Sequence, residues 1–85
     1  MIHLTLYTRA DCHLCHEMRV VVQEVRRALA AGHTVELEEV DVDGDPRLTA
    51  VYGADVPVLC VNGRKAFKYR VDAARLRARL ARELG

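Results

Sequence analysis

The stretch Asp-Cys-His-Leu-Cys-His at residues 11–16 stands between two segments of different periodicity. Apolar and polar residues alternate over residues 2–7, which is the pattern of a half-buried β-strand. Over residues 14–29 apolar residues recur every three or four positions, the pattern of an amphipathic helix. Cys12 and Cys15 therefore lie where a strand turns into a helix, and two thiols at that spacing can close a small disulfide ring.

The position of Cys12, just before the first helical turn, favours thiolate chemistry. Unpaired backbone amides and the positive end of the helix dipole stabilise an anion there, and the nearby Arg9 adds positive charge. Cys15 continues the apolar side of the helix, so we expect its sulfur to face inward. This division predicts that Cys12 is the attacking thiolate of a dithiol pair and Cys15 the resolving thiol.

The first helix is expected to connect two parallel strands. Gly32 marks its end, where we expect a residue in the left-handed conformation. Residues 34–42 then alternate, with a change of phase near residues 38–39 that predicts an irregularity in the strand. Asp45 and Pro46 open a short helix, with the aspartate as the cap and the proline at the first helical position.

The second half of the chain predicts a hairpin and a closing helix. Residues 56–61 form a buried apolar run, and the chain returns from it through an Asn-Gly turn, the strongest two-residue hairpin signal. We expect Phe67 and Tyr69 on one face of the returning strand, and Asp72 as the cap of the last helix. Residues 1–85 therefore predict one α/β domain of β-α-β-α-β-β-α order, with a four-stranded mixed sheet and helices on both faces.

Composition excludes several classes of protein. The chain is 51% apolar and 29% charged, as in an ordinary globular protein, and no apolar run reaches the roughly 18 residues of a membrane-spanning helix. The first residues lack the features of a secretory signal, so we expect a cytoplasmic monomer without a membrane or nucleic-acid partner. Three cysteines argue against a disulfide framework and leave Cys60 by itself. We expect Cys60 to have a packing role on a buried strand, and the alternative is a third redox thiol.

Charge is divided unevenly along the chain. Residues 1–63 carry five Arg and ten Asp or Glu, whereas residues 64–85 carry eight Lys or Arg and two Asp or Glu. We expect the basic end to form a solvated helix face that neutralises the acidic stretch at residues 36–45. The alternative is that it attracts an anionic partner or the carboxylates of a peptide thiol.

The order of these motifs resembles that of the glutaredoxins, and especially their smaller glutaredoxin-like relatives, in the thioredoxin-fold superfamily. The resemblance covers nearly the whole chain, and it implies a thioredoxin-like fold. It also implies a thiol-disulfide oxidoreductase that needs no cofactor and exchanges disulfides with a protein or a small thiol such as glutathione. The motifs that carry it are Tyr7-Thr8-Arg9 before Cys-x-x-Cys, Glu39-Val40-Asp41-Val42-Asp43 with Asp45-Pro46, Tyr52-Gly53, and Val56-Pro57-Val58.

The resemblance implies roles for four residues outside the dithiol. Pro57 would be a cis-proline beside the active site, and Val56, before it, would offer backbone groups to a bound peptide thiol. Arg9 falls where glutaredoxins carry a basic residue that holds a glutathione carboxylate. Asp72 would be a second charged anchor for the substrate.

Two departures from the glutaredoxins bear on the choice of substrate. His13 and Leu14 stand between the cysteines, where a proline-containing pair is common. Tyr69 and Arg70 stand where glutaredoxins usually have two glycines whose backbone contacts glutathione. The bulk at this place predicts weak binding of glutathione and a preference for a protein or another thiol partner.

Other functions fit the same cysteines. The sequence Cys-His-Leu-Cys-His at residues 12–16 matches the attachment signature of a c-type haem. The two cysteines with His13 or His16 supply part of a zinc site, or part of an iron–sulfur cluster shared between two chains, as in some glutaredoxin relatives. A redox-inactive interaction domain of the same fold is the remaining alternative.

Overall fold

The chain forms four strands and three α-helices in the predicted order, in a computed structural model that describes residues 1–85. The elements are β1 (Ile2–Thr8), α1 (His13–Leu29), β2 (Val35–Asp41), a 3-10 turn η1 (Val42–Gly44), α2 (Pro46–Tyr52), β3 (Val58–Val61), β4 (Arg64–Lys68) and α3 (Ala73–Leu84). No helix among them is both long enough and apolar enough to cross a membrane.

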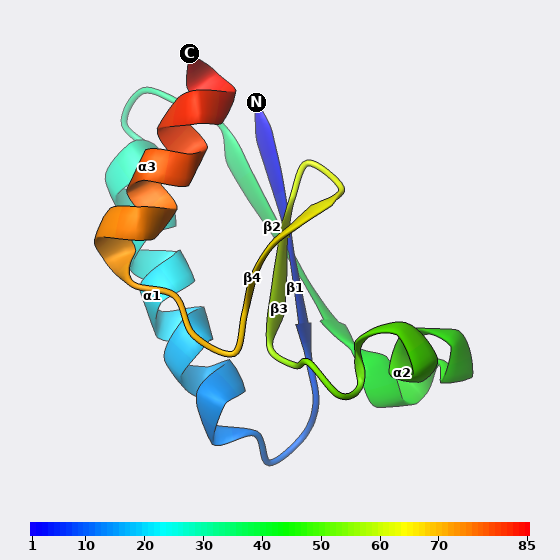
Figure 1. Cartoon of the computed structure of the whole chain (residues 1–85). Helices are drawn as coiled ribbons and strands as arrows, with labels where there is room; N and C mark the ends of the chain where they lie inside the picture. Colours follow the sequence, from blue (N-terminus) through cyan, green and yellow to red (C-terminus); the bar gives the residue numbers. More distant parts are fainter.

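The strands form one mixed sheet in the order β2-β1-β3-β4 (Figure 1). β1 and β2 are parallel and are connected through α1, whereas β3 is antiparallel to both of its neighbours, β1 and β4. Asn62 (φ 50°) and Gly63 (φ 84°) both take the positive φ that a tight hairpin turn requires. The predicted hairpin and fold class are therefore confirmed, and β2 and β4 form the two edges of the sheet.

The main core lies between one face of the sheet and the helices α1 and α3 (Figure 1). Alternate residues of β1 point toward the helices, and each fully buried aliphatic side chain of this kind contributes about 1.5–3 kcal/mol to folding. The helices contribute residues three or four positions apart, as the periodicity predicted. The buried set includes Ile2, Leu4 and Leu6 of β1, Met18, Val22 and Val25 of α1, and Leu76 and Leu80 of α3.

The opposite face of the sheet meets α2 only near one end (Figure 1). Tyr7 of β1 points to this face, and its ring stacks on that of Tyr52 at the end of α2, with centroids 4.1 Å apart. Helices thus contact both faces, as predicted, but two cover one face and the short α2 covers part of the other. The segment from η1 to the start of β3 is anchored to the sheet through this tyrosine pair.

The prediction of an irregularity in β2 is wrong. β2 pairs with β1 along its whole length without a register shift. The apolar phase changes because Val40 pairs with Tyr7 on the face opposite α1, whereas Val42 lies beyond the strand, buried in η1. The one register shift of the sheet falls instead between Leu59 and Cys60, where β3 pairs with β4.

Two further expectations about local structure are wrong. Gly63 is the only glycine with positive φ, so Gly32 does not end α1 in a left-handed conformation. The helix ends at Leu29, and Ala30 follows it with ordinary helical angles (φ −62°, ψ −20°). Tyr69 does not share a strand face with Phe67, because β4 ends one residue before Tyr69.

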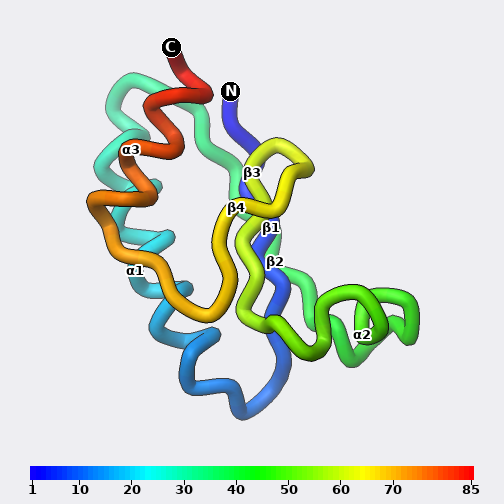
Figure 2. Tube along the Cα trace, viewed as in Figure 1, coloured from blue at the N-terminus to red at the C-terminus, as the bar shows by residue number.

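The starts of α2 and α3 agree with the sequence. The carboxylate of Asp45 accepts a hydrogen bond from the backbone N–H of Arg47 (2.8 Å), and that of Asp72 accepts one from Arg75 (2.8 Å). Both aspartates are therefore helix caps. The two chain ends lie at one end of the molecule, and the turn that leads into α1 lies at the other (Figure 2).

Candidate active site

Cys12 and Cys15 form a disulfide at the start of α1, with their Cα atoms 5.2 Å apart. Cys12 is the N-cap residue, in an extended conformation, and its sulfur accepts a hydrogen bond from the backbone N–H of Cys15 (3.1 Å). The sulfur thus occupies the place at which a helix start stabilises negative charge. Cys12 is half-buried, whereas Cys15 is 1% exposed and faces the core, as expected.

The segment before β3 leaves the sheet at the same end as the dithiol loop. Tyr7 at the end of β1 pairs with Val58 at the start of β3, so the chain leading to Cys12 and the residues preceding Val58 lie beside each other. The peptide bond between Val56 and Pro57 is cis, which confirms the prediction. The backbone N–H and C=O of Val56 form no hydrogen bond with the rest of the chain, which leaves both free to pair with a substrate backbone.

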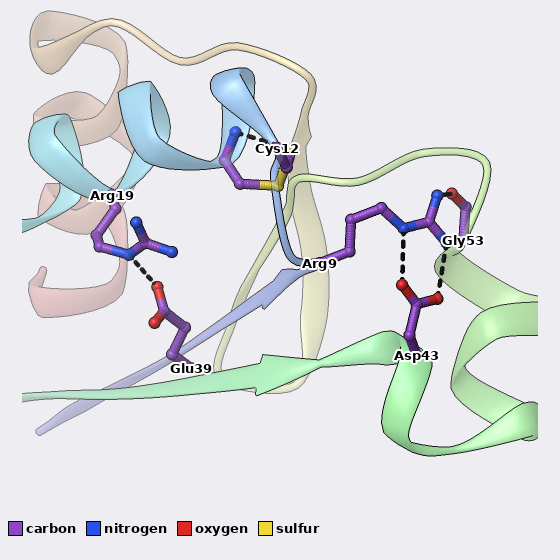
Figure 3. Close-up of a disulfide and its surroundings, with 7 residues drawn as sticks. Arg9, Cys12, Arg19, Glu39, Asp43 and Gly53 are labelled. Carbon is purple, nitrogen blue, oxygen red and sulfur yellow. Dashed lines mark hydrogen bonds and ion pairs between the residues drawn. A yellow bond between two sulfur atoms is a disulfide. The ribbon is translucent and has the colours of Figure 1, made fainter.

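Arg9 joins the dithiol loop to η1 and to the end of α2 (Figure 3). Its Nε and Nη2 donate to the two carboxylate oxygens of Asp43 (3.2 and 3.0 Å), and its Nη1 donates to the carbonyl oxygen of Gly53 (3.0 Å). The hydrogen bond and the charge of Asp43 raise the pKa of Arg9. Because Gly53 precedes the segment that carries Val56, Arg9 fixes that segment relative to Cys12.

Tyr69 has a backbone conformation that glycine adopts more readily than other residues. Its backbone has a φ of 67°, a left-handed conformation that bulky residues rarely adopt and that glycine adopts at little cost. Its backbone N–H donates to the carbonyl oxygen of Pro57 (2.9 Å), and its hydroxyl donates to the carboxylate of Asp55 (3.1 Å). The tyrosine side chain therefore runs alongside the segment that leads to the cis-proline, and it is 42% exposed.

Asp55 is held in its charged form by this contact. The hydrogen bond from Tyr69 and then that from Lys65 lower the pKa of Asp55. The same hydrogen bond is the main cause that raises the pKa of Tyr69. Sequence reasoning assigned no role of its own to Asp55 or Asp43. Asp55 lies in a loop and Asp43 in η1, and each acts on a partner 10 or more residues away.

A surface ion-pair network flanks the dithiol on the other side. Glu17, one helical turn after His13, lies 3.5 Å from the His13 ring nitrogen and 3.5 Å from the guanidinium of Arg70. Beside it a hollow of about 360 Å³ opens between α1 and the loop after β4. Its lining consists of Glu17, Met18, Val20, Val21, Tyr69, Arg70 and Val71.

Cys60 lies on the opposite face of the sheet from α1, which carries the dithiol. It pairs with Thr5 on the face of the sheet that points away from α1, and it is 4% exposed and unpaired. Burial raises the pKa of its thiol, and burial likewise raises the pKa of the neighbouring Tyr52 to about 12. These positions fit the packing role expected for Cys60.

A metal site within one chain needs at least three ligands close together. Nowhere in the chain do three or more His, Cys, Asp or Glu side chains lie together so that they could hold a metal ion.

Comparison with known proteins matches nearly the whole chain to one domain family. A model of the glutaredoxin-like domain (DUF836) matches residues 3–81. The chain is 38% identical over 80 residues to the "uncharacterized protein Rv0508" of Mycobacterium tuberculosis, which covers 91% of this chain and 80% of that protein.

Solved structures give the same result for the fold. The X-ray structure of the protein XcR50 from X. campestris is 41% identical, covers 93% of this chain and 96% of its own, and has a TM-score of 0.66. Chloroplastic thioredoxin z is 15% identical and matches all of this chain and 80% of its own, with a TM-score of 0.79. At that identity the second likeness concerns the thioredoxin fold alone.

Proposed function

The chain belongs to the glutaredoxin-like domain family, and from its site we propose that it is a thiol-disulfide oxidoreductase that works through the Cys12–Cys15 dithiol. The observation that carries the proposal is the pairing of a half-buried sulfur at a helix N-cap with a buried second sulfur one turn away. A helix start stabilises the thiolate, and the thiolate is the form that attacks disulfides.

The reaction proceeds in two exchange steps. The Cys12 thiolate attacks one sulfur of a substrate disulfide, so that a mixed disulfide forms and the other substrate sulfur leaves as a thiolate. Cys15, after losing its proton, then attacks the Cys12 sulfur and releases the second substrate thiolate. The substrate gains two electrons and two protons, and the protein is left with the Cys12–Cys15 disulfide.

Val56 and Pro57 supply the docking edge in this proposal. The unpaired N–H and C=O of Val56 can form a short antiparallel pairing with the backbone beside the substrate's cysteine. Pro57 has no N–H and therefore leaves no competing donor near the sulfurs. Tyr69 binds the carbonyl oxygen of Pro57 and so closes the side of this edge that faces β4.

Arg9 and Asp72, the expected charged anchors, both have structural partners. Arg9 donates hydrogen bonds to Asp43 and to the carbonyl oxygen of Gly53. One N–H on each of its two Nη atoms is left for a substrate carboxylate. One carboxylate oxygen of Asp72 caps α3, which leaves the other oxygen for a substrate amine. We propose that both residues position the site and that any contact with the substrate is additional.

Tyr69 favours a protein substrate over glutathione. Its side chain lies where a glycine would leave room for the tripeptide, and its hydroxyl is tied to Asp55. Loss of two backbone hydrogen bonds to a small ligand, at about 1 kcal/mol each, weakens its binding by roughly tenfold or more. A protein substrate has a larger contact area and can bind without them.

The test is turnover of two substrates by the reduced protein, a protein disulfide and a glutathionylated peptide, each measured with glutathione or with thioredoxin and its reductase as electron source. We expect the protein disulfide to be reduced faster, and Cys12→Ser to abolish both reactions. Tyr69→Gly should raise turnover of the glutathionylated peptide, whereas Tyr69→Phe should not. Full reduction of both substrates by Cys12→Ser, or no reduction by the unmodified protein, contradicts the proposal.

A further inference from the structure

The sheet order separates the acidic and basic parts of the chain. β2 and the residues after it, up to Asp45, carry six acidic and no basic side chains, and they lie at one edge of the sheet. The basic segment from β4 to the end of α3 lies at the opposite edge, with β1 and β3 between. The expected neutralisation of the acidic stretch by the basic end is therefore wrong. The acidic side pairs instead with Arg9 and Arg19.

Four hollows on the basic side share lining residues with one another. The hollow beside Tyr69 and the next hollow are both lined by Arg70 and Val71. Arg75 lines that second hollow and also a third one, which lies between β4 and α3. The third and fourth hollows are both lined by residues of β4. We call this track, which runs from Tyr69 along β4 to Arg82, the β4–α3 groove. Its basic lining residues are Lys65, Lys68, Arg70, Arg75, Arg79 and Arg82, its acidic ones are Glu17 and Asp72, and its apolar floor includes Ala66, Phe67 and Ala78.

The groove runs along a free strand edge. β4 pairs only with β3, and apart from the carbonyl oxygen of Lys68, which accepts from Arg70 (2.8 Å), no group on its outer edge has a hydrogen-bond partner. A free edge presents alternating N–H and C=O groups that can take an added strand. An extended peptide therefore finds free backbone partners at the outward-facing residues of β4, apart from the carbonyl oxygen of Lys68.

Only some of the basic side chains of the groove form ion pairs with acidic side chains. Asp55 is shared by Lys65 (3.3 Å) and Lys68 (3.9 Å), whereas Arg75 and Arg82 form no ion pair at all. Lysines on an edge strand also prevent it from pairing with the edge strands of other chains, so the two lysines alone are not evidence for a binding site. The arginines of α3 lie across the groove from that edge, and protection of the edge does not account for them.

We propose that the β4–α3 groove binds an extended acidic segment of the protein whose disulfide is exchanged. The segment adds to the sheet as a strand on β4, with its carboxylates facing Arg75 and Arg82. This inference rests on the proposed function and names the partner class for that site. Because β4 spans five residues, or about 17 Å, the added strand is about five residues long.

Other anionic occupants fit the groove less well. Glu17 and Asp72 stand at the end nearest the dithiol and repel a continuous phosphate backbone. Tyr69 is the only large aromatic side chain that is well exposed, which leaves a single-stranded nucleic acid almost no stacking surface. The acidic edge of a second copy is complementary in charge, but such a head-to-tail contact joins two different surfaces and forms a ring or an open filament rather than a two-fold dimer.

The test uses a fluorescent ten-residue peptide rich in Asp and Glu, its Asn and Gln counterpart, and a single-stranded oligonucleotide, each titrated into the full chain. We expect the acidic peptide to bind at least tenfold more tightly than the other two, with an affinity that falls as salt rises. Hydrogen exchange of the outward-facing β4 amides should slow in its presence. The double variant Arg75→Glu/Arg82→Glu should lose at least tenfold in affinity, whereas Arg47→Glu, exposed on α2, should lose nothing.

Several results would overturn the inference. These are equal binding of the acidic and neutral peptides, tighter binding of the oligonucleotide, unchanged exchange of the β4 amides, or self-association that the double variant abolishes. Turnover of a small uncharged disulfide separates this inference from the proposed function. We expect that turnover to be normal in the double variant and lost in Cys12→Ser, and peptide binding to survive in Cys12→Ser. A chain that binds the peptide but never reduces the small disulfide contradicts only the proposed function.

Discussion

At the scale of single residues, the three cysteines differ in exposure and in electrostatic setting. Cys12 lies at a helix cap, Cys15 lies in the core beneath it, and Cys60 lies on the other side of the sheet. Exposure and thiolate stabilisation control the reactivity of a thiol. The three positions therefore predict three separate rates of modification.

Alkylation of the reduced native protein should label Cys12 first and Cys60 last. Burial raises the pKa of Cys60 and blocks access to it, so we expect its modification only after denaturant is added. Mass spectrometry of peptides at successive times measures the order, with Cys60→Ala as the control for assignment. Labelling of Cys60 in the native protein as fast as Cys12 would contradict both its burial and its packing role.

Asp55 should make stability depend on pH on the acid side. Because its pKa in the folded protein lies below the ordinary value of 3.8, its contribution is present above pH 3.8 and is lost as the pH falls through the lowered pKa. Asp55→Asn should therefore be less stable than the unmodified protein at neutral pH, and the difference should shrink in acid. Urea midpoints at several pH values measure it, with Glu24→Gln as the control. A difference that is constant with pH would contradict the prediction.

At the scale of elements, caps and turns define where helices and strands begin. Asp45 before Pro46, Asp72 before α3, and Asn62 before Gly63 each satisfy a local requirement of the backbone, and all of them were predicted from the sequence. Gly32 is a local signal that failed, since it does not take the left-handed conformation, and the other wrong predictions concern what the sequence does not encode locally. From the sequence alone, Val40 and Val42 could point to either face of the sheet. The pairing of β2 with β1 determines which face each position of the strand takes.

Asp72 offers a test that separates capping from substrate binding. Asp72→Ala should lower the free energy of unfolding by about 1 kcal/mol, because the N–H of Arg75 loses its acceptor. Asp72→Asn keeps an acceptor and should lose little stability. Denaturant titration measures both variants. If Asp72→Asn preserves stability but raises the KM for a thiol substrate, the carboxylate charge also contacts the substrate, whereas equal KM values limit its role to the cap.

At the scale of the whole molecule, the dithiol was predictable and its surroundings were not. Cys12 and Cys15 are neighbours in sequence, and the cis-proline follows from the resemblance to glutaredoxins. Arg9, by contrast, meets Asp43 across 34 positions, and Tyr69 meets Asp55 across 14. Such contacts depend on the packing of loops, which no periodicity encodes. The pairing of Arg9 with Asp43, which we call the clamp, therefore emerges only from the structure.

The clamp between Arg9 and Asp43 should be measurable as a coupling energy. The Arg9–Asp43 ion pair is bidentate, but its side chains are about half exposed. A double-mutant cycle with Arg9→Ala and Asp43→Ala should therefore give a coupling energy of about 0.5–1 kcal/mol. Both single variants should also slow disulfide exchange, because the segment with Val56 is no longer fixed. The cycle Arg19→Ala with Glu39→Ala, an ion pair away from the dithiol loop, serves as the control and should leave exchange unchanged. Zero coupling for the Arg9 pair would contradict the clamp.

The most direct test of the central claim is to trap the mixed disulfide. Reduced Cys15→Ser is mixed with a disulfide-containing peptide, quenched with acid, and analysed by mass spectrometry. We predict one peptide attached at Cys12, whereas Cys12→Ser gives no adduct and the unmodified protein ends with the Cys12–Cys15 disulfide and free peptide thiols. An adduct at Cys60, or no adduct on Cys15→Ser under conditions that oxidise a simple dithiol, would contradict the claim that this chain exchanges disulfides through Cys12.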